Sequence, residues 1–241
     1  MVFEYLPYNL SQLLNGTDYL VSVGKIKRLC SQILQGLAYI HQHGYFHRDM
    51  KPENLLVNNK LDVIKIADFG LAREIDSKEP YAHYVGTRWY RPPELLLGSK
   101  KYGPELDMWS MGAIMAEMFT RRPLFLGENH ADMLSKICSV IGSPSEDSWA
   151  DGLHLARDMQ YQFPQHPGTP LSLLIPLANE DAINLITSLC SWDPAKRPTA
   201  AEALQHPFFH VKVSESELAR RIIQRPHAAE SKETISTPFM F

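Results

Sequence analysis

The sequence predicts a mainly α-helical fold with one short β-hairpin region. Apolar residues recur at helical spacing through residues 23–40 and again through residues 105–119. Two short apolar runs at 55–57 and 63–66 surround a polar turn at 58–60, which is the pattern of two neighbouring strands. The chain has 241 residues, 44% of them hydrophobic, and is therefore long enough to bury the core of one sizeable domain.

Capping residues mark both ends of the helix predicted at residues 23–40. Ser22 precedes it and carries a side-chain oxygen that can accept from the free backbone N–H groups of a first helical turn. Gly44 follows it, and a glycine just past the last turn is a common helix end. Further helices are predicted at residues 132–141, 180–190 and 200–205.

Two segments lack this periodicity. Residues 142–177 are rich in Pro, Gly, Ser, His and Asp, and we expect an irregular insertion there. Periodicity also weakens after Phe209. Residues 211–241 carry two prolines and mixed charge, which predicts a flexible C-terminal tail.

Charge and composition exclude several classes of function. A net charge of −3 provides no basic surface for general nucleic-acid binding. No apolar run approaches the roughly 18 residues of a membrane span, and the first residues lack the pattern of a signal peptide. Cys30, Cys138 and Cys190 are odd in number and far apart, which argues against a disulfide framework. We expect a soluble, reduced, monomeric protein inside the cell, in the cytoplasm, the nucleus or both, with neither nucleic acid nor membrane as partner.

The most informative segment is residues 47–54, which read His-Arg-Asp-Met-Lys-Pro-Glu-Asn and are followed by Asp-Phe-Gly at 68–70. A lone aspartate after an arginine is typical of a surface turn. Here Asp49, Lys51 and Asn54 place an acid, an amine and an amide on one short loop. Phosphoryl transfer needs this set, because a carboxylate orients the hydroxyl nucleophile, a cation balances the transferred phosphate, and oxygen atoms hold Mg²⁺.

The pattern H-R-D-x-K-x-x-N with a downstream D-F-G resembles the catalytic and metal loops of eukaryotic protein kinases. The resemblance implies that Asp49 orients the substrate hydroxyl. It also implies that Lys51 neutralises the γ-phosphate and marks serine or threonine as the acceptor. Asn54 and Asp68 are the implied ligands of Mg²⁺, which holds the phosphates of ATP. His47 is implied to be a buried structural residue that braces the Asp-Phe-Gly turn.

Residues 1–8 resemble the hinge that joins the two lobes of a kinase. In this interpretation the Glu4 carbonyl and the backbone of Leu6 contact adenine. Phe3 is then the residue at the back of the ATP pocket, and Leu56 forms its floor. The implied cofactors are therefore ATP and Mg²⁺.

Residues 68–94 resemble the metal loop and activation segment of the same enzymes, and they end in Gly-Thr-Arg-Trp-Tyr-Arg-Pro-Pro-Glu. The resemblance assigns supporting roles to four residues outside the catalytic loop: Thr87, which ties Asp49 to Lys51; Glu94 and Arg197, which form a buried ion pair; and Asp107, which anchors the catalytic-loop backbone.

The Trp-Tyr-Arg triplet and the sequence of the catalytic loop resemble the group of cyclin-dependent and mitogen-activated kinases (CMGC), and within it the MAK/ICK/MOK branch. That branch carries Thr-x-Tyr in its activation loop, whereas this chain has Ala82 and Tyr84. A phosphothreonine would pair with arginines such as Arg48 and Arg73, and Ala82 cannot replace it. Either loop ordering depends on Tyr84 alone, as the target of an upstream kinase, or activation differs.

Kinases also need a glycine-rich loop and a strand lysine, and neither is among the 46 residues before His47. The resemblance therefore predicts a kinase-like large lobe over residues 9–210, without the N-terminal β lobe. Negligible turnover is expected from this chain alone, because one side of its ATP cleft is open to water.

The leading hypothesis is a serine/threonine kinase lobe that acts on protein substrates, with a preference for proline after the acceptor. The alternative is a non-catalytic truncated form that binds or regulates partner proteins. A nucleotide-binding metabolic enzyme is a more distant alternative, because no Walker or Gly-x-Gly-x-x-Gly loop occurs.

Overall fold

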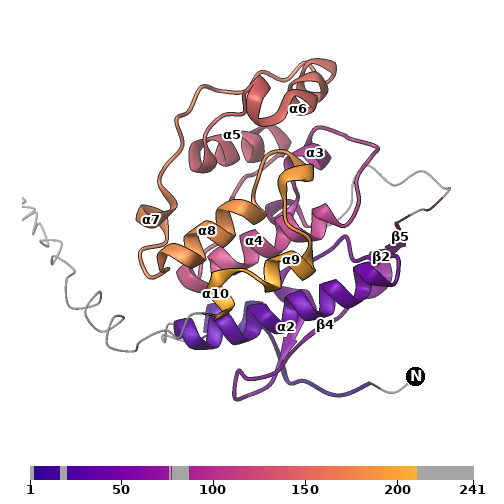
Figure 1. Cartoon of the computed structure of the whole chain (residues 1–241), viewed down its shortest axis with the longest axis vertical. Helices are drawn as coiled ribbons and strands as arrows, with labels where there is room; N and C mark the ends of the chain where they lie inside the picture. Colours follow the sequence, from indigo (N-terminus) through magenta and orange to yellow (C-terminus); the bar gives the residue numbers. More distant parts are fainter. Residues whose placement is uncertain (1–2, 17–20, 76, 78–86, 211–241) are drawn as a thin grey trace, which may run out of the picture. The chain divides into compact units, whose positions relative to one another are not determined.

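Helix α4 (Glu105–Thr120) forms the centre of the molecule, and α2 (Val23–Gln42) and α8 (Glu180–Leu189) pack against it (Figure 1). All α4 residues from 106 to 119 are buried. Most of them are apolar, as a helix that is covered on every side requires. Gly112 permits the close approach of α8, since a Cβ atom there would lie 2.6 Å from the Cys190 sulfur. The structure is a computed structural model that describes residues 3–16, 21–75, 77 and 87–210.

Helix α2 confirms the prediction for residues 23–40 and continues for two more residues. Ser22 caps it as expected, because its side chain accepts from the backbone N–H of Lys25. The buried side chains of α2 form a single stripe toward α4 that includes Ile26, Ile33 and Leu37. Gly44 has a positive φ of 80° just beyond the helix, a conformation that glycine adopts without steric cost.

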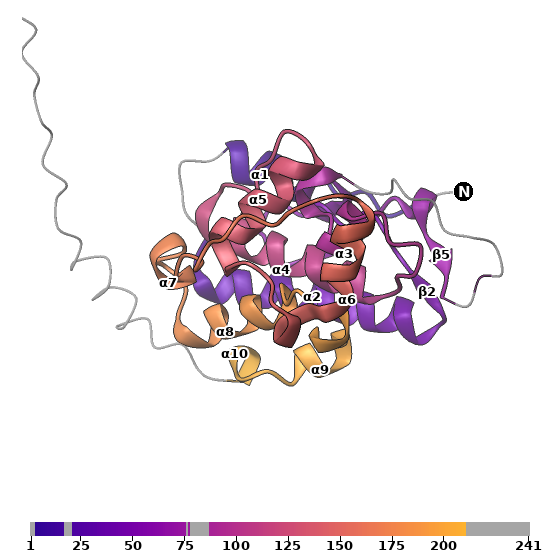
Figure 2. The ribbon, with the colours of Figure 1, turned by 90° about the horizontal axis from the view of Figure 1, so that it is seen from above.

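Two small antiparallel sheets lie beside α2. The first has the order β1-β3-β4, in which β3 (Leu55–Val57) and β4 (Ile64–Ile66) form the predicted hairpin and β1 (Tyr8–Asn9) pairs with β3. The second joins β2 (Tyr45–Phe46) to β5 (Arg73–Glu74), which Figure 2 shows at one edge of the molecule. Strands β1, β2 and β5 were not predicted, because two residues are too few to show an alternating pattern.

The other predicted helices are confirmed to within two residues at their ends. Helix α5 starts at His130 rather than at residue 132, because Asn129 caps it by accepting from the N–H of Asp132. The remaining elements with their bounds are α1 (Leu10–Gly16), η1 (Pro52–Asn54), η2 (Phe69–Leu71), η3 (Arg88–Tyr90), α3 (Pro93–Leu96), α5 (His130–Ile141), η4 (Pro194–Lys196), α9 (Ala200–Leu204) and α10 (Pro207–His210).

The prediction of an irregular insertion at residues 142–177 is wrong in part. The segment contains helix α6 (Glu146–Asp158) and the short helix α7 (Leu171–Leu174). Ser145 and Ser148 form a capping box at the start of α6, so that polar residues expected in a loop instead begin a helix. The helix buries Trp149 against Trp192, with ring centroids 5.8 Å apart.

None of the described helices is long and apolar enough to cross a membrane. The predicted tail at residues 211–241 lies outside the described residues.

Candidate active site

Asp49 is buried, with its side chain 8% exposed, and hydrogen bonds hold both of its carboxylate oxygens. Oδ2 accepts from Lys51 Nζ at 2.7 Å and from Asn54 Nδ2 at 3.1 Å. Oδ1 accepts from the backbone N–H of Thr87 at 3.0 Å and lies 3.5 Å from the Thr87 hydroxyl. Two neighbours on its own loop and one residue from a distant segment therefore fix the carboxylate in one orientation.

Asp107, near the start of α4, holds the loop that carries Asp49. Its Oδ2 accepts from the His47 backbone N–H at 2.8 Å, and its Oδ1 accepts from the Arg48 N–H at 2.9 Å. His41, which lies on α2, places its ring Nε2 2.8 Å from the same Asp107 Oδ2. Arg48 has a φ of 71°, which is strained for a residue with a side chain. The contact expected of Asp107 is thus present, and it fixes the strained entry to the catalytic loop.

The fully buried His47 connects the catalytic loop to the Asp-Phe-Gly turn. Its Nε2 lies 2.9 Å from the carbonyl of Ala67, and its ring packs edge-on against Phe69 at 5.1 Å. The N–H of Ala67 donates to the Asn54 carbonyl at 2.9 Å, which brings Asn54 close to the start of that turn. Asp68 is exposed and has a φ of 62°, and its carboxylate accepts from the Gly70 N–H at 3.3 Å. Two hard-oxygen side chains therefore stand on adjacent loops.

A buried ion pair joins the end of the activation segment to the loop after α8. The Glu94 carboxylate accepts from both terminal nitrogens of Arg197 at 2.7 Å. Arg197 donates its other hydrogen bonds to backbone carbonyls, those of Ser191, Trp192 and Glu105. The pair is 3% and 6% exposed, so the structure brings Glu94 and Arg197 together as expected.

Two polar side chains of α4, which were not predicted from the sequence, hold the Arg88–Tyr90 turn. The Tyr90 hydroxyl donates to Glu117 at 2.8 Å, and the Ser110 hydroxyl donates to the Tyr90 carbonyl at 2.8 Å. The same turn begins at Thr87, which contacts Asp49. Glu117 could have been found as a charged residue within an otherwise apolar helix, since such residues are rarely buried without a partner.

The pKa of Glu117 is raised to about 7, mainly by burial, with the Tyr90 hydrogen bond opposing the rise and the nearby Glu53 adding to it. Because the folded pKa exceeds the ordinary value, the protonated carboxyl stabilises the fold below pH 4.5. This contribution is lost as the pH rises toward 7. Its full size is on the order of 3 kcal/mol. The wild-type free energy of unfolding should therefore fall relative to that of Glu117→Gln between pH 5 and pH 8.

Urea unfolding of both proteins across this pH range measures the effect. The Glu53→Gln variant is the matched control, because it removes a charge that raises the Glu117 pKa. In this variant the pH range over which stability is lost should be narrower. Parallel pH profiles for wild type and Glu117→Gln would show that the Glu117 carboxyl does not titrate in this range.

The predicted hinge lies at the side of the first sheet. Tyr8, the last residue of the predicted hinge, pairs with Val57, and the next residue, Asn9, pairs with the half-buried Leu56. Glu4 lies 3.4 Å from the exposed amine of Lys65. Phe3 is 79% exposed, so the expected position of Phe3 at the back of a pocket is not what the structure shows. Leu6 is half-buried.

The residues predicted to order the activation loop are only partly described. Tyr84 and Ala82 lie outside the described residues. Arg48 is buried, with its Nη1 3.5 Å from the Tyr102 hydroxyl. Arg73 is half-buried in β5 and pairs with Phe46 of β2, the residue that precedes the catalytic loop.

No group of three or more His, Cys, Asp or Glu side chains in the described part of the chain could hold a metal ion. Asn54 and Asp68 do not form a group of that kind, because they provide one amide oxygen and one carboxylate. This set suits Mg²⁺, which binds through one or two carboxylates together with the phosphates of a nucleotide.

The chain is similar to known proteins over most of its length. A family model described as protein kinase domain matches residues 1–209. The chain is 56% identical over 208 residues to cyclin-dependent kinase F-4 of Oryza sativa subsp. japonica, covering 86% of this chain and 45% of the relative. It is 52% identical over 210 residues to serine/threonine-protein kinase MAK of Mus musculus, covering 87% of this chain and 34% of the relative. The chain therefore spans between a third and a half of the length of these relatives.

Among solved structures, the yeast RNA Pol II CTD kinase CTDK-1 complex contains a chain that superposes with a TM-score of 0.82 at 34% sequence identity. The match covers 88% of this chain and 71% of that one. At this identity the likeness extends to the sequence as well as to the fold.

Proposed function

Because this chain belongs to the protein kinase family, we propose that it is the catalytic lobe of a serine/threonine kinase that transfers the ATP γ-phosphate to protein hydroxyls. The observation that carries the proposal is the fixed Asp49 carboxylate. Lys51, Asn54 and Thr87 hold it in place, and Asp107 fixes the loop from beneath.

In this proposal Asp49 accepts the hydrogen bond of the substrate hydroxyl and aims the hydroxyl oxygen at the phosphate. Lys51, already 2.7 Å from Asp49, places positive charge beside the transferred group. Thr87 holds the opposite carboxylate oxygen, so that the carboxylate does not rotate when substrate binds. The rate advantage comes from this pre-organisation, since the groups need no rearrangement during the transfer.

Asn54 and Asp68 would hold Mg²⁺. The amide nitrogen of Asn54 donates to the Asp49 carbonyl and carboxylate, which leaves its Oδ1 as the oxygen available for a metal. When bound, Mg²⁺ supplies positive charge to the ATP phosphates. Adenine would lie beside the hinge, with the Glu4 carbonyl and the Leu6 backbone as partners and Leu56 beneath it.

The finer assignments are also proposals. The sequence around the catalytic loop supports the MAK/ICK/MOK branch, and relatives named MAK and ICK are 52% and 50% identical to this chain. From that branch we infer a preference for proline after the acceptor, and Tyr84 as the target of an upstream kinase. Localisation inside the cell stays a prediction.

A non-catalytic role in binding partner proteins is the second candidate, and one observation favours it. Phe69 of the Asp-Phe-Gly turn is 50% exposed and Phe3 is 79% exposed, so that the side of the lobe that would meet ATP is open to water. Phosphate transfer depends on excluding water from the charged groups. We therefore infer negligible turnover for these 241 residues by themselves.

Acceptor specificity tests the proposal. The longest natural polypeptide that carries these residues should transfer phosphate to serine peptides and leave matched tyrosine peptides unmodified. A serine followed by proline should react at least about tenfold faster than a serine followed by alanine, which corresponds to roughly 1.4 kcal/mol. Radiolabelled ATP with these three peptides measures it, and the 241-residue chain alone is the low-activity control. Transfer to tyrosine at a comparable rate would contradict the serine/threonine assignment.

A further inference from the structure

We propose that two adjoining cavities on the described part of the chain form one docking groove for a partner protein. The segment that fits has apolar residues next to lysines or arginines. This docking is separate from phosphate transfer, and the groove contains none of the residues 47–54 or Asp68.

The first cavity is apolar, has a volume of about 630 Å³, and lies where the end of α2 meets the starts of α4 and α9. Arg197 and His41, two of the polar residues that line it, already have partners in the fold. Arg197 donates to Glu94 and to three carbonyls, and the His41 ring contacts Asp107. An occupant therefore gains little from hydrogen bonds here and gains from burying apolar surface. The apolar lining includes Ala38, Ile75, Met108, Pro194, Pro198 and Ala201.

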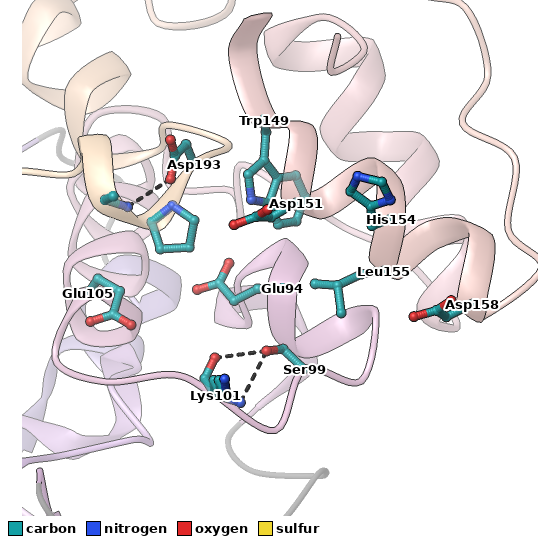
Figure 3. Close-up of a pocket in the computed structure, with 12 residues that line it drawn as sticks. Glu94, Ser99, Lys101, Glu105, Trp149, Asp151, His154, Leu155, Asp158 and Asp193 are labelled. Carbon is teal, nitrogen blue, oxygen red and sulfur yellow. Dashed lines mark hydrogen bonds between the residues drawn. The ribbon is translucent and has the colours of Figure 1, made fainter. Parts of the chain in front are cut away.

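The second cavity has a volume of about 560 Å³ and shares a wall with the first, because Glu105, Pro194 and Ala195 line both. Figure 3 shows that its side chains come from α3, α6, the start of α4 and the loop at Asp193. Each cavity is within the range of about 300–1,000 Å³ that is typical of ligand sites, and together they exceed what one small molecule fills.

The second cavity is acidic. The Glu94 carboxylate is paired with Arg197, but four other carboxylates line the cavity against a single permanent cation, Lys101. Backbone N–H groups donate to Glu105 and Asp193, but the lining keeps a net negative charge, which disfavours phosphate-rich partners and favours lysine or arginine. The four carboxylates belong to Glu105, Asp151, Asp158 and Asp193.

An apolar cavity beside an acidic one determines which occupant fits both. An extended peptide can place apolar side chains in the first cavity while its basic side chains reach the second across the shared wall. The apolar half supplies most of the affinity. Because Asp151 and Asp158 are exposed, their ion pairs supply specificity and a dependence on salt. A small apolar molecule or a free polyamine would fill only one half.

A fluorescein-labelled Leu-Pro-Leu-Gly-Arg-Lys-Arg peptide is a suitable probe, with binding to the 241-residue chain measured by fluorescence anisotropy. We expect saturable binding that weakens as NaCl rises. A peptide with glutamates in place of the three basic residues should bind at least about tenfold more weakly. A peptide with serines in place of both leucines should also lose affinity. Absence of saturable binding, or equal binding of the basic and acidic peptides, would overturn the proposal.

Variants in each half locate the site. The double variant Asp151→Asn with Asp158→Asn removes two exposed charges, and we expect about fivefold weaker binding. Ala201→Phe fills the apolar half at an exposed position and should weaken binding similarly. Glu180→Gln, an exposed carboxylate on α8 outside both cavities, is the matched control and should have no effect. If both groove variants bind like the control, the peptide binds elsewhere and the groove assignment is wrong. The charge variants test the site even if Ala201→Phe fails to fold.

Discussion

Replacing Arg197 with methionine should lower the free energy of unfolding by about 3–5 kcal/mol, because it leaves the buried Glu94 carboxylate without its partner. The carboxylate loses both of its 2.7 Å hydrogen bonds. The carbonyls of Ser191, Trp192 and Glu105 lose their donor in the same step. Each buried group left unsatisfied adds to the cost.

Urea unfolding measures this loss, and the chain offers a matched control. Arg157 and Glu146 form an ion pair at 3.0 Å in which both side chains are at least 60% exposed. Arg157→Met removes the same kind of group from water-screened surroundings and should cost at most about 1 kcal/mol. Equal losses for the two variants would show that burial does not determine the strength of the Glu94–Arg197 pair.

A second replacement separates the charge from the carbonyl contacts. In the double variant Glu94→Leu with Arg197→Met, neither position carries a charge, so we expect part of the lost stability to return. The three carbonyls still lack a donor, and recovery should therefore be incomplete. Full recovery would assign the whole effect to the unpaired carboxylate.

The helices could be predicted where a single physical signal dominates. Helix α2 has one apolar stripe and a serine cap, and both are visible as residue types in the chain. The β3–β4 hairpin was visible as two apolar runs around a polar turn. Helix α6 was missed because its capping residues and exposed face consist of the residue types that also make loops. The helix buries Trp149 against the distant Trp192, and such a contact cannot be read from local sequence.

In the candidate site, too, contacts within one short segment could be predicted, whereas contacts between distant residues could not. The resemblance placed Asp49, Lys51 and Asn54 on one loop, and the distances between them follow from that short segment. Glu117 was missed because its partner Tyr90 is 27 residues away, and only the fold brings the two together. Phe3 was placed in a pocket by analogy, whereas the structure leaves it exposed.

The proposed mechanism of phosphate transfer depends on Asp49 as the residue that orients the acceptor hydroxyl. All four groups that contact its carboxylate are donors: Lys51 Nζ, Asn54 Nδ2, and the backbone N–H and hydroxyl of Thr87. Asparagine has a single side-chain oxygen, so its NH₂ group must face one of these donors. It also cannot accept a proton from the hydroxyl. Asp49→Asn should therefore slow phosphate transfer by about 10²–10⁴-fold. ATP binding, which we propose to involve the hinge, Asn54 and Asp68, should stay unchanged.

The rate of single-turnover phosphate transfer from ATP to a serine peptide is the most direct test. It should be measured for Asp49→Asn and wild type in the longest natural polypeptide that carries these residues. Asp147→Asn, an exposed carboxylate on α6, is the matched control and should retain the wild-type rate. We predict a loss of at least about a hundredfold for Asp49→Asn with an unchanged affinity for MgATP. A rate within tenfold of wild type would remove Asp49 from its catalytic role and contradict the proposed mechanism.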